Sequence, residues 1–517
     1  MKYISLFLAC LILLGAFVGC NDKPAATTKK PLASTPQSDA TGDPEEEYLE
    51  LYYDDRVYVR EIAGKVVAHI DIKDQVITST SIATGESDEN ILKYDYDKGR
   101  IIAVGTGTAT LVLDDVEYKV RVSPAPITLT IITGHSSGAG SKGNGEESVL
   151  CEAGTAYNKS LDMKSSAWKT SLRGSSLGYY AEDRVPEIDC ITDDAGKTKG
   201  ARGVNSALAY EWHNLTGEKM WVMNCAVGGS CINQWQPGHP DKYLDYTIEA
   251  MNRAHNILKN EVSAGHYEYK GTYFINFGNS NWDYQNVTGS DELYVEWNDG
   301  MWQGTIDGAT VDIDGDGEID TPAALAYLPS WSHKTTNFNH DAPLMHYRAM
   351  SEDYPDIFYA TTMRRLWSTE EAIVEYFPDI NYTTQSGVKL QKPTNMKEFL
   401  AEDNKHLAQV SYNALGLDLA LSLYQFVTKD YELKSVTLYD VTGGCKEVGS
   451  SMTIKVGEKN QFVAISDPCP INDFEITVTG VLTIDELFYV TGTKKGEGEL
   501  IIKHNGEVVK SVKITVK

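Results

Sequence analysis

The sequence places a serine two positions after a strand-like run and an Asp-x-x-His pair much further along the chain. Ser136 follows the apolar run "APITLTIITG", whose terminal glycine lets the chain turn so that the hydroxyl projects from the strand end. Asp403 precedes "NKHLAQVSYNALG", an amphipathic segment that predicts a helix, and His406 lies three positions after Asp403. A serine hydroxyl is a weak nucleophile that needs a base, so these residue types in this order suit acyl transfer.

The spacing of Asp403 and His406 predicts how the pair is held. An Asp just before a helix caps free N–H groups, and a residue three positions on lies about one turn further. Asp403 would then accept one ring N–H of His406 and leave the other nitrogen to act as a base toward Ser136. Two plainer interpretations stay open, namely a turn serine at Ser136 and a surface histidine behind an N-cap at His406.

Two further loops could stabilise a developing oxyanion. Gly228 and Gly229 follow the strand-like segment "KMWVMNCAV" and expose backbone N–H groups. After "YKGTYFINFG" comes Asn279, whose amide side chain would lie at the same edge of a sheet. We therefore predict an oxyanion hole formed by the N–H groups of Ser136 and Gly229 together with Asn279. Close packing alone is the other interpretation of the glycine pair.

The acidic segment "DIDGDGEID" has the spacing of an EF-hand-type calcium loop. Alternate carboxylates on a tight turn suit a hard cation, and the carbonyl at position 7 is a further ligand. Ala323 replaces the bidentate Glu of position 12, and Pro322 discourages a following helix. We predict an isolated structural Ca2+ site and no cofactor for catalysis, with a solvated acidic turn as the alternative. The ligand residues would be Asp312, Asp314, Asp316, Glu318 and Asp320.

The segments around these loops alternate between strand and helix over residues 126–430. Three apolar β runs lead into the loops just described, and the helical segments are "NSALAYEWHNLTG", ended by Gly217, "YLDYTIEAMNRAHNILKNEV" and "HLAQVSYNALGLDLALSLYQFV". Such alternation predicts an α/β fold, a three-layer α/β/α (flavodoxin-like) domain with a parallel sheet. Reactive groups in these sheets collect where loops leave the carboxyl ends of the strands.

Residues 48–125 and 431–517 have a different pattern, with short alternating β runs between turn residues. Both predict a small β-sandwich of the bacterial immunoglobulin-like kind, and His504-Asn505-Gly506 predicts a hairpin turn in the second. Cys445 and Cys469 lie in that second region and are the disulfide pair we favour. Residues 21–47, rich in Pro, Ser, Thr and Ala, predict a flexible linker.

Residues 1–20 have the features of a signal peptide, with Lys2, an apolar run and small residues before Cys20. They resemble a bacterial lipobox, which predicts lipidation at Cys20 and a place in the cell envelope, at the outer membrane or cell surface or facing the periplasm. The membrane would be contacted only through that lipid anchor; a plain secretory signal is the alternative. The net charge of −27 argues against a nucleic-acid partner, because an acidic surface repels phosphates.

Four blocks in chain order resemble the sialate O-acetylesterase-like branch of the SGNH hydrolases. They are "ITGHSSGAG", "NCAVGGSCINQW", "YFINFGNSN" and "DNKHLAQVSYNALG". The family carries Gly-Gln-Ser-Asn-Met, Gly-Gly-Thr/Ser…Trp, Trp-x-Gln-Gly-Glu-Ser and Asp-x-x-His at the corresponding places, and the resemblance covers about 300 residues. It implies Ser136 as nucleophile, His406 as base, Asp403 as its orienter and Gly229 as part of the oxyanion hole.

The resemblance also implies the removal of acyl groups, usually acetyl, from sugar hydroxyls through an acyl-enzyme, without a metal. The partner would be an acylated glycan. This chain departs from the family at His135 and Phe277, each of which replaces a Gln. Losing one oxyanion donor costs about 2.7–4 kcal/mol, unless Asn279 or Asn281 substitutes. We expect a carbohydrate O-acetylesterase-like serine hydrolase, and the alternative is a surface glycan-binding or adhesion lipoprotein with impaired catalysis.

Overall fold

The computed structural model describes the chain from residue 48 onward, in stretches. These are residues 48–58, 100–144 without 114–115, 203–278, 291–328, 353–360, 400–443 without 404–405, 446–468 and 473–517, with shorter pieces at 71–72, 75–76, 82–84, 89–95, 147–149 and 158–161 and the single residues 348 and 398. The predicted signal peptide with Cys20, the linker, Asn279, Asn281, Cys445 and Cys469 lie outside the described residues. Within the described part, no helix is both long enough and apolar enough to cross a bilayer.

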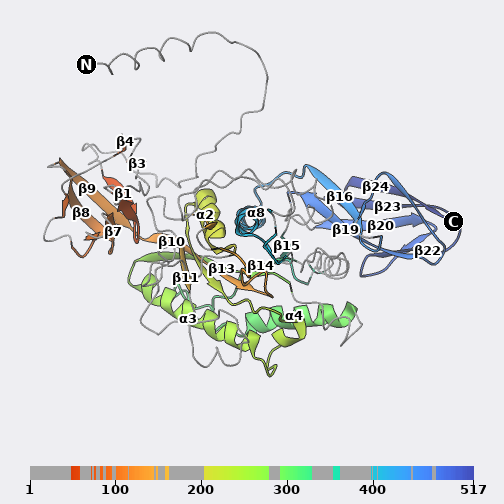
Figure 1. Ribbon diagram of the computed structural model, residues 1–517, viewed down its shortest axis with the longest axis horizontal. Helices are drawn as coiled ribbons and strands as arrows, with labels where there is room; N and C mark the ends of the chain where they lie inside the picture. The colour runs from red at the N-terminus through yellow and green to blue at the C-terminus, as the bar shows by residue number, and fades with distance from the viewer. Residues whose placement is uncertain are drawn as a thin grey trace, which may run out of the picture. The chain divides into compact units, whose positions relative to one another are not determined.

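A six-stranded parallel sheet forms the centre of the α/β region (Figure 1). Every pairing between neighbouring strands is parallel, and the order across the sheet is β11-β12-β10-β13-β14-β15. Without β11, which adds an unpredicted edge strand, the chain order is the 2-1-3-4-5 of flavodoxin-like sheets. The prediction of an α/β fold around a parallel sheet is confirmed. The strands are β10 (Ala125–Thr133), β11 (Asn158–Leu161), β12 (Lys219–Asn224), β13 (Tyr267–Asn276), β14 (Ala324–Tyr327) and β15 (Ile357–Tyr359).

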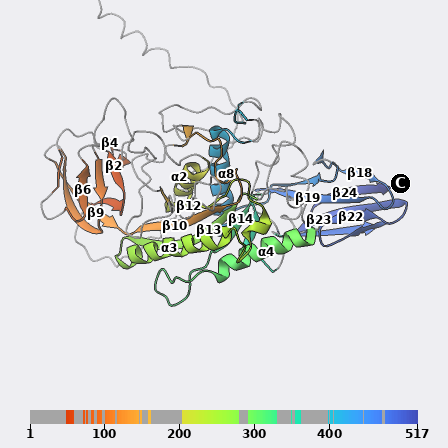
Figure 2. The same ribbon diagram turned by 60° about the horizontal axis from the view of Figure 1, so that its bottom comes forward.

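Helices cover both faces of this sheet (Figures 1 and 2). Successive side chains of β12 point to opposite faces, so Met220 and Val222 join one core while Trp221 and Met223 join the other. The first core is completed by α2 (Asn205–Thr216) and α8 (Gln409–Thr428), and the second by α3 (Tyr243–Ser263) and α4 (Asp291–Asp307). The result is the predicted three-layer arrangement.

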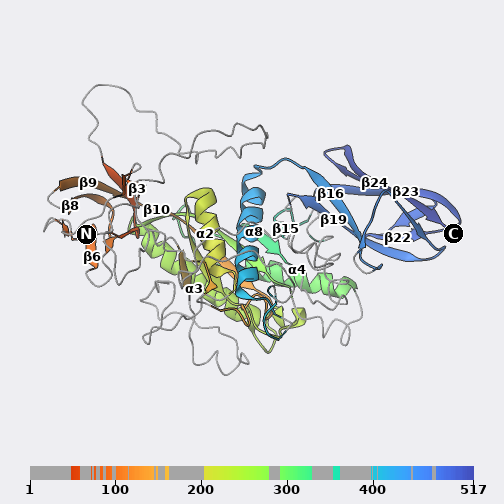
Figure 3. The ribbon, with the colours of Figure 1, turned by 45° about the horizontal axis from the view of Figure 1, so that its top comes forward.

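Helices α2 and α8 lie side by side on their face of the sheet (Figure 3). As predicted, α2 ends at Gly217, which has a φ of 76° and donates its N–H to the His213 carbonyl at 2.8 Å. Gly416 of α8 packs closely against the start of α2. A Cβ at Gly416 would lie 2.7 Å from the Val204 carbonyl oxygen and 2.9 Å from the Leu208 nitrogen.

The residues before and after the α/β region form antiparallel-rich sheets that enclose their own cores. Before it, the sheet β1-β9-β8-β5 and the sheet β2-β7-β6 share one apolar cluster, and β3 and β4 form a separate pair. The strands are β1 (Leu49–Tyr52), β2 (Arg56–Tyr58), β3 (Asp71–Ile72), β4 (Gln75–Val76), β5 (Ile82–Thr84), β6 (Leu92–Asp95), β7 (Arg100–Ala103), β8 (Gly107–Leu113) and β9 (Val116–Ser123).

After the α/β region, the sheets β17-β16-β19-β22-β21 and β18-β24-β23-β20 share a second cluster. Asn505 and Gly506 have φ values of 51° and 79° and connect β23 to β24, which confirms the predicted hairpin turn. The immunoglobulin-like assignment of both regions stays a prediction. The strands are β16 (Ser435–Asp440), β17 (Lys446–Glu447), β18 (Ser451–Ile454), β19 (Lys459–Asp467), β20 (Phe474–Gly480), β21 (Leu482–Ile484), β22 (Tyr489–Gly492), β23 (Gly496–His504) and β24 (Glu507–Val516).

The substitution Gly416→Ala should destabilise the protein, although alanine is the better helix former. The propensity gain is about 0.5–1 kcal/mol, whereas forcing a methyl group against backbone atoms of α2 costs about 1–3 kcal/mol. Thermal unfolding measured by circular dichroism should show a lower midpoint. Gly449→Ala is the control, because nothing lies within 4 Å of the added Cβ there. Equal midpoints for the two variants would contradict the close helix contact.

Candidate active site

Ser136, the predicted nucleophile, lies in a sharp turn that follows β10. The turn begins at Gly134, whose φ of +107° lies in the left-handed region that favours glycine. A Cβ at Gly134 would come within 2.7 Å of the Gly278 carbonyl oxygen, to which the His135 N–H donates at 3.2 Å. The turn is therefore pressed against the loop that follows β13. It carries the half-buried Ser136 at the carboxyl edge of the sheet, at the switch point of the strand order.

The structure brings His406 and Asp403 to this turn, although 270 positions separate His406 from Ser136. His406 Nε2 lies 3.0 Å from Ser136 Oγ, and His406 Nδ1 lies 2.6 Å from Asp403 Oδ2. Because an ionised carboxylate can only accept, Nδ1 carries the proton and Nε2 accepts the hydroxyl of Ser136. The side chains of His406 and Asp403 are 23% and 25% exposed, so neither is sealed from solvent.

The backbone around Asp403 and His406 corrects the expectation of a helix start. Helix α8 begins only after Ala408, so His406 lies before the helix and Asp403 is not its N-cap. Leu400 and Leu407 form an antiparallel bridge, and the extended backbone that this requires keeps the helix from starting earlier. Asp403 instead closes the loop itself, because its Oδ1 accepts the His406 backbone N–H at 3.0 Å while Oδ2 holds the ring.

His135, one of the two departures from the resembled family, is buried beside the nucleophile. Its Nδ1 accepts the Ser137 N–H at 3.2 Å and lies 3.4 Å from Ser136 Oγ. An N–H donates to Nδ1, so this nitrogen is unprotonated and its lone pair is already engaged. His406, whose Nε2 lies closer to the hydroxyl, is therefore the better placed base, and His135 shapes the turn.

Two backbone N–H groups, one in the nucleophile turn and one in the glycine turn that borders it, are available as donors. Among the described residues, neither the Ser136 N–H nor the Gly229 N–H donates a hydrogen bond. Gly229 is exposed, with a φ of +79°, in a turn closed by the Ser230 N–H donating to the Val227 carbonyl at 3.1 Å. A Cβ at Gly228 would lie 3.9 Å from Ser136 Cβ, so this turn borders the nucleophile. Two donors of the kind that an oxyanion needs are thus available there.

Phe277 and Cys225 also lie at the ends of central strands, and neither competes with Ser136. The Phe277 side chain is 3% exposed and packs in the core shared with α2 and α8, so it lines the interior and offers no donor. Cys225 is a buried free thiol, and burial raises its pKa to about 12. A thiol with that pKa is not a nucleophile at neutral pH.

Two asparagines that shape these loops were not predicted from the sequence. Asn224 ends β12 and Asn276 ends β13, and each side chain accepts the N–H of the residue two positions on, Ala226 at 3.1 Å and Gly278 at 2.7 Å. Such turns end a strand and lead the chain out of the sheet. The signal was present in "VMNCA" and "FINFG", where a polar residue closes an apolar run.

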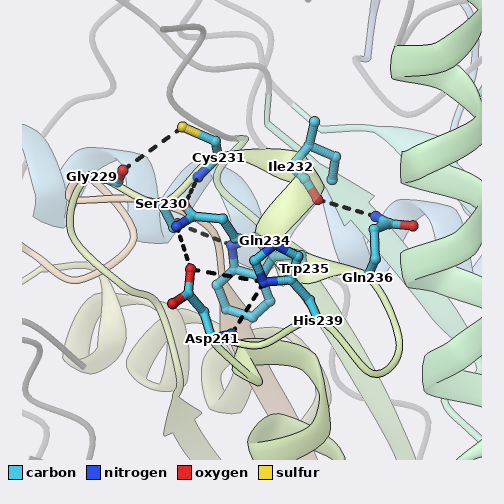
Figure 4. Close-up of polar contacts among 9 residues, drawn as sticks. All are labelled: Gly229, Ser230, Cys231, Ile232, Gln234, Trp235, Gln236, His239 and Asp241. Carbon is cyan, nitrogen blue, oxygen red and sulfur yellow. Dashed lines mark hydrogen bonds and ion pairs between the residues drawn. The ribbon is translucent and has the colours of Figure 1, made fainter. Parts of the chain in front are cut away.

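A hydrogen-bond network holds the loop that carries Gly229 (Figure 4). The short 3-10 helix η2 (Ile232–Trp235) begins after Cys231, whose N–H donates to Gln234 Oε1 at 2.8 Å. Gln234 Nε2 in turn donates to Asp241 Oδ2 at 2.7 Å. Side-chain hydrogen bonds therefore fix the conformation of this loop, which borders the predicted nucleophile.

The acidic loop keeps part of the predicted calcium arrangement. Oxygen atoms of the Asp312, Asp314 and Asp320 carboxylates all lie within 4.8 Å of one another. Asp316 and Glu318 are exposed, and Asp316 Oδ1 accepts the Glu318 N–H at 2.8 Å. Burial, and after it the charges of the neighbouring aspartates, raises the pKa of Asp320. Carboxylates gathered in this way are hard oxygen ligands that fit a divalent cation.

The solved structures that resemble this chain include three distant likenesses. No family model and no curated protein matches the chain. A carbohydrate acetylesterase from Xanthomonas citri is 12% identical, covering 90% of this chain and 95% of that one with a TM-score of 0.34. A protein from Arabidopsis thaliana is 15% identical over 59% of this chain and 98% of its own, with a TM-score of 0.27.

An endo-beta-1,4-mannanase from Thermotoga petrophila is 12% identical over 60% of this chain and 71% of its own, with a TM-score of 0.22. Likenesses this distant assign no family. The class is therefore given by the fold and the site themselves, an α/β protein with a hydrogen-bonded serine, histidine and aspartate at the carboxyl edge of a parallel sheet.

The short contact between His406 and Asp403 predicts a low-field imidazole proton resonance. A charge-assisted hydrogen bond of 2.6 Å deshields the Nδ1 proton and slows its exchange with water. Proton NMR on protein labelled with ¹⁵N at histidine should show this resonance in the wild type and in Ser136→Ala, which keeps the Asp403 contact. Asp403→Ala should lose it. Persistence of the resonance in Asp403→Ala would show that another group holds the ring.

Proposed function

We propose that this chain is a serine esterase that removes acetyl or other small acyl groups from carbohydrate hydroxyls. The observation that carries the proposal is the hydrogen-bonded chain from Ser136 Oγ through His406 to Asp403. A serine so connected is an activated nucleophile. The choice of a small acyl group on a sugar rests on the resemblance of the four sequence blocks that contain or border these residues.

In the first half of the reaction, Ser136 Oγ attacks the ester carbonyl carbon and His406 Nε2 takes the hydroxyl proton. The negative charge that forms on the carbonyl oxygen is stabilised by the N–H groups of Ser136 and Gly229. His406 then gives its proton to the sugar oxygen as the ester bond breaks. The deacylated sugar leaves with its hydroxyl restored, and the acyl group stays on Ser136.

In the second half, water replaces the sugar. His406 removes one proton from the water, whose oxygen attacks the acyl-enzyme, and then returns that proton to Ser136 Oγ as the carboxylic acid leaves. Asp403 keeps the ring of His406 in the tautomer that both halves need and stabilises the imidazolium that forms within each half. The same proposal includes lipidation at Cys20 and a place in the bacterial cell envelope, where acylated glycans are accessible.

Replacing the three residues should reduce the hydrolysis of an acetylated sugar by different factors. We expect kcat to fall by about 10⁶-fold in Ser136→Ala or His406→Ala and by about 10⁴-fold in Asp403→Ala, because groups that act as one unit do not contribute additively. Steady-state release of acetate measures the effect. Mass spectrometry after treatment with a fluorophosphonate should show one adduct, on Ser136.

Ser141→Ala is the matched control for these substitutions. Ser141 lies on the same loop, and within the described part of the chain it forms hydrogen bonds only through its backbone, whose N–H donates to the Ser136 carbonyl at 3.0 Å. It should therefore hydrolyse the ester at the wild-type rate. If the wild type and Ser136→Ala release acetate equally slowly, the esterase proposal is wrong. The alternative, a catalytically impaired glycan-binding lipoprotein, is then favoured, and the departures from the family at His135 and Phe277 motivate it.

We also propose that the acidic loop binds calcium in a structural role. The approach of the Asp312, Asp314 and Asp320 carboxylates supports this proposal, with Asp316 and the Glu318 carbonyl as further ligands. The raised pKa of Asp320 means that ionisation of this carboxyl lowers the stability of the fold as the pH rises through that pKa. A bound cation would offset this loss of stability.

Calcium should therefore raise the thermal unfolding midpoint of the loop's region at neutral pH. A ligand present at 100 times its Kd stabilises by about 2.7 kcal/mol, and the gain should shrink at acidic pH as Asp320 takes up its proton. Differential scanning calorimetry with and without calcium measures this. Asp314→Asn should lose most of the response, whereas Asp430→Asn, an exposed aspartate elsewhere, should keep it. An identical calcium response in both variants would exclude the site.

A further inference from the structure

One carbonyl group, that of Gly134, holds both ends of the glycine turn that borders Ser136. It accepts the Val227 N–H at 2.8 Å and the Ser230 hydroxyl at 3.2 Å. Val227 and Ser230 are the first and last residues of the turn that contains Gly229. A carbonyl oxygen has two lone pairs, so both are occupied by this one turn. The peptide that precedes His135 and Ser136 is thereby fixed to the loop after β12.

The Ser230 hydroxyl is oriented by Trp235, the last residue of η2 (Figure 4). Trp235 Nε1 donates to Ser230 Oγ at 3.0 Å, which leaves the hydroxyl proton for the Gly134 carbonyl. Ser230 is 1% exposed and Trp235 is 0% exposed, so water cannot replace either bond. The Trp235 indole therefore has a polar role as well as an apolar one, because its N–H fixes the direction of the Ser230 hydroxyl.

We propose that Ser230 and Trp235 are positioning residues that fix the Gly229 amide relative to the Ser136 hydroxyl. The inference rests on the proposed esterase function. Neither side chain touches substrate; both act through the Gly134 carbonyl. The turn bears two glycines, which have the largest backbone freedom, so it needs an external contact to hold one conformation.

The contact should matter for the transition state and not for substrate binding. An oxyanion exists only once Ser136 has attacked, so a displaced Gly229 amide lowers kcat and leaves KM largely unchanged. Removing an oxyanion donor outright costs about 10²–10³-fold in kcat. Loosening the same donor should cost less, about 10–100-fold, because the Val227 bond to Gly134 remains.

Kinetics of acetyl-ester hydrolysis test the proposal through a double-mutant cycle. Ser230→Ala should lower kcat about 10–100-fold with KM within about twofold, and Trp235→Phe should lower kcat by less. The double variant should match Ser230→Ala, because Trp235 acts only through the hydroxyl that is already lost. Ser422→Ala, a buried serine of α8, is the matched control and should keep the wild-type kcat.

Hydrogen exchange measured by mass spectrometry gives a readout that does not depend on activity. Ser230→Ala should speed exchange in the peptide that contains Val227 and Ser230, whose amides hold the turn, and should leave the peptides of β13 unchanged. If Trp235→Phe does not fold, the double-mutant cycle is lost, but hydrogen exchange in Ser230→Ala still tests the proposal.

The outcomes separate the two proposals. Unchanged exchange in Ser230→Ala overturns the positioning role, whether or not the wild type hydrolyses the ester. Faster exchange together with an active wild type and an unchanged kcat overturns it as well. If Ser230→Ala exchanges faster but the wild type does not hydrolyse the ester, only the esterase function is overturned. That result still supports the role of Ser230 in holding the turn.

Discussion

The 3.0 Å hydrogen bond between Ser136 and His406 is the interaction on which the proposed chemistry depends. The two side chains are 270 positions apart, and closing a loop of that length opposes the contact entropically. What offsets this cost is apolar burial, because β10 and α8 contribute to one core on the same face of the sheet. The serine leaves the carboxyl end of β10, and the histidine lies just before α8, so packing that face brings the two together.

Close contacts between backbone segments then fix the positions of the loops that carry Ser136 and His406. Gly134 lets the nucleophile turn press against the loop after β13, and Gly416 lets α8 settle against α2. At each place a side chain would meet backbone atoms, which cannot rotate away. Asn224 and Asn276 act beside them by ending the two strands that flank β10 with the same kind of side-chain hydrogen bond. Loop geometry at this edge is thus set by small and amide residues, while the apolar residues set the layers.

Some features followed directly from local sequence. The end of α2 at Gly217 and the hairpin at Asn505 and Gly506 were predictable because both need a positive φ, which few residues adopt. The start of α8 was not predictable, since the bridge between Leu400 and Leu407 competes with the helix and is not visible in the pattern. Edge strand β11 escaped notice for a similar reason, because a four-residue strand is defined by the partner that it pairs with.

By itself, the sequence determined the alternation of three strands and three helices in the α/β region and the residue types that follow those strands, because periodicity and turn chemistry are local properties. It also proposed Ser136, Asp403 and His406 as one set. Only the tertiary structure decided that the three form a hydrogen-bonded chain, that Asp403 closes a loop instead of capping a helix, and that Phe277 points into the core. Those outcomes depend on distances between segments far apart in the chain, which are fixed by the packing of the sheet and its helices and not by any neighbouring residue.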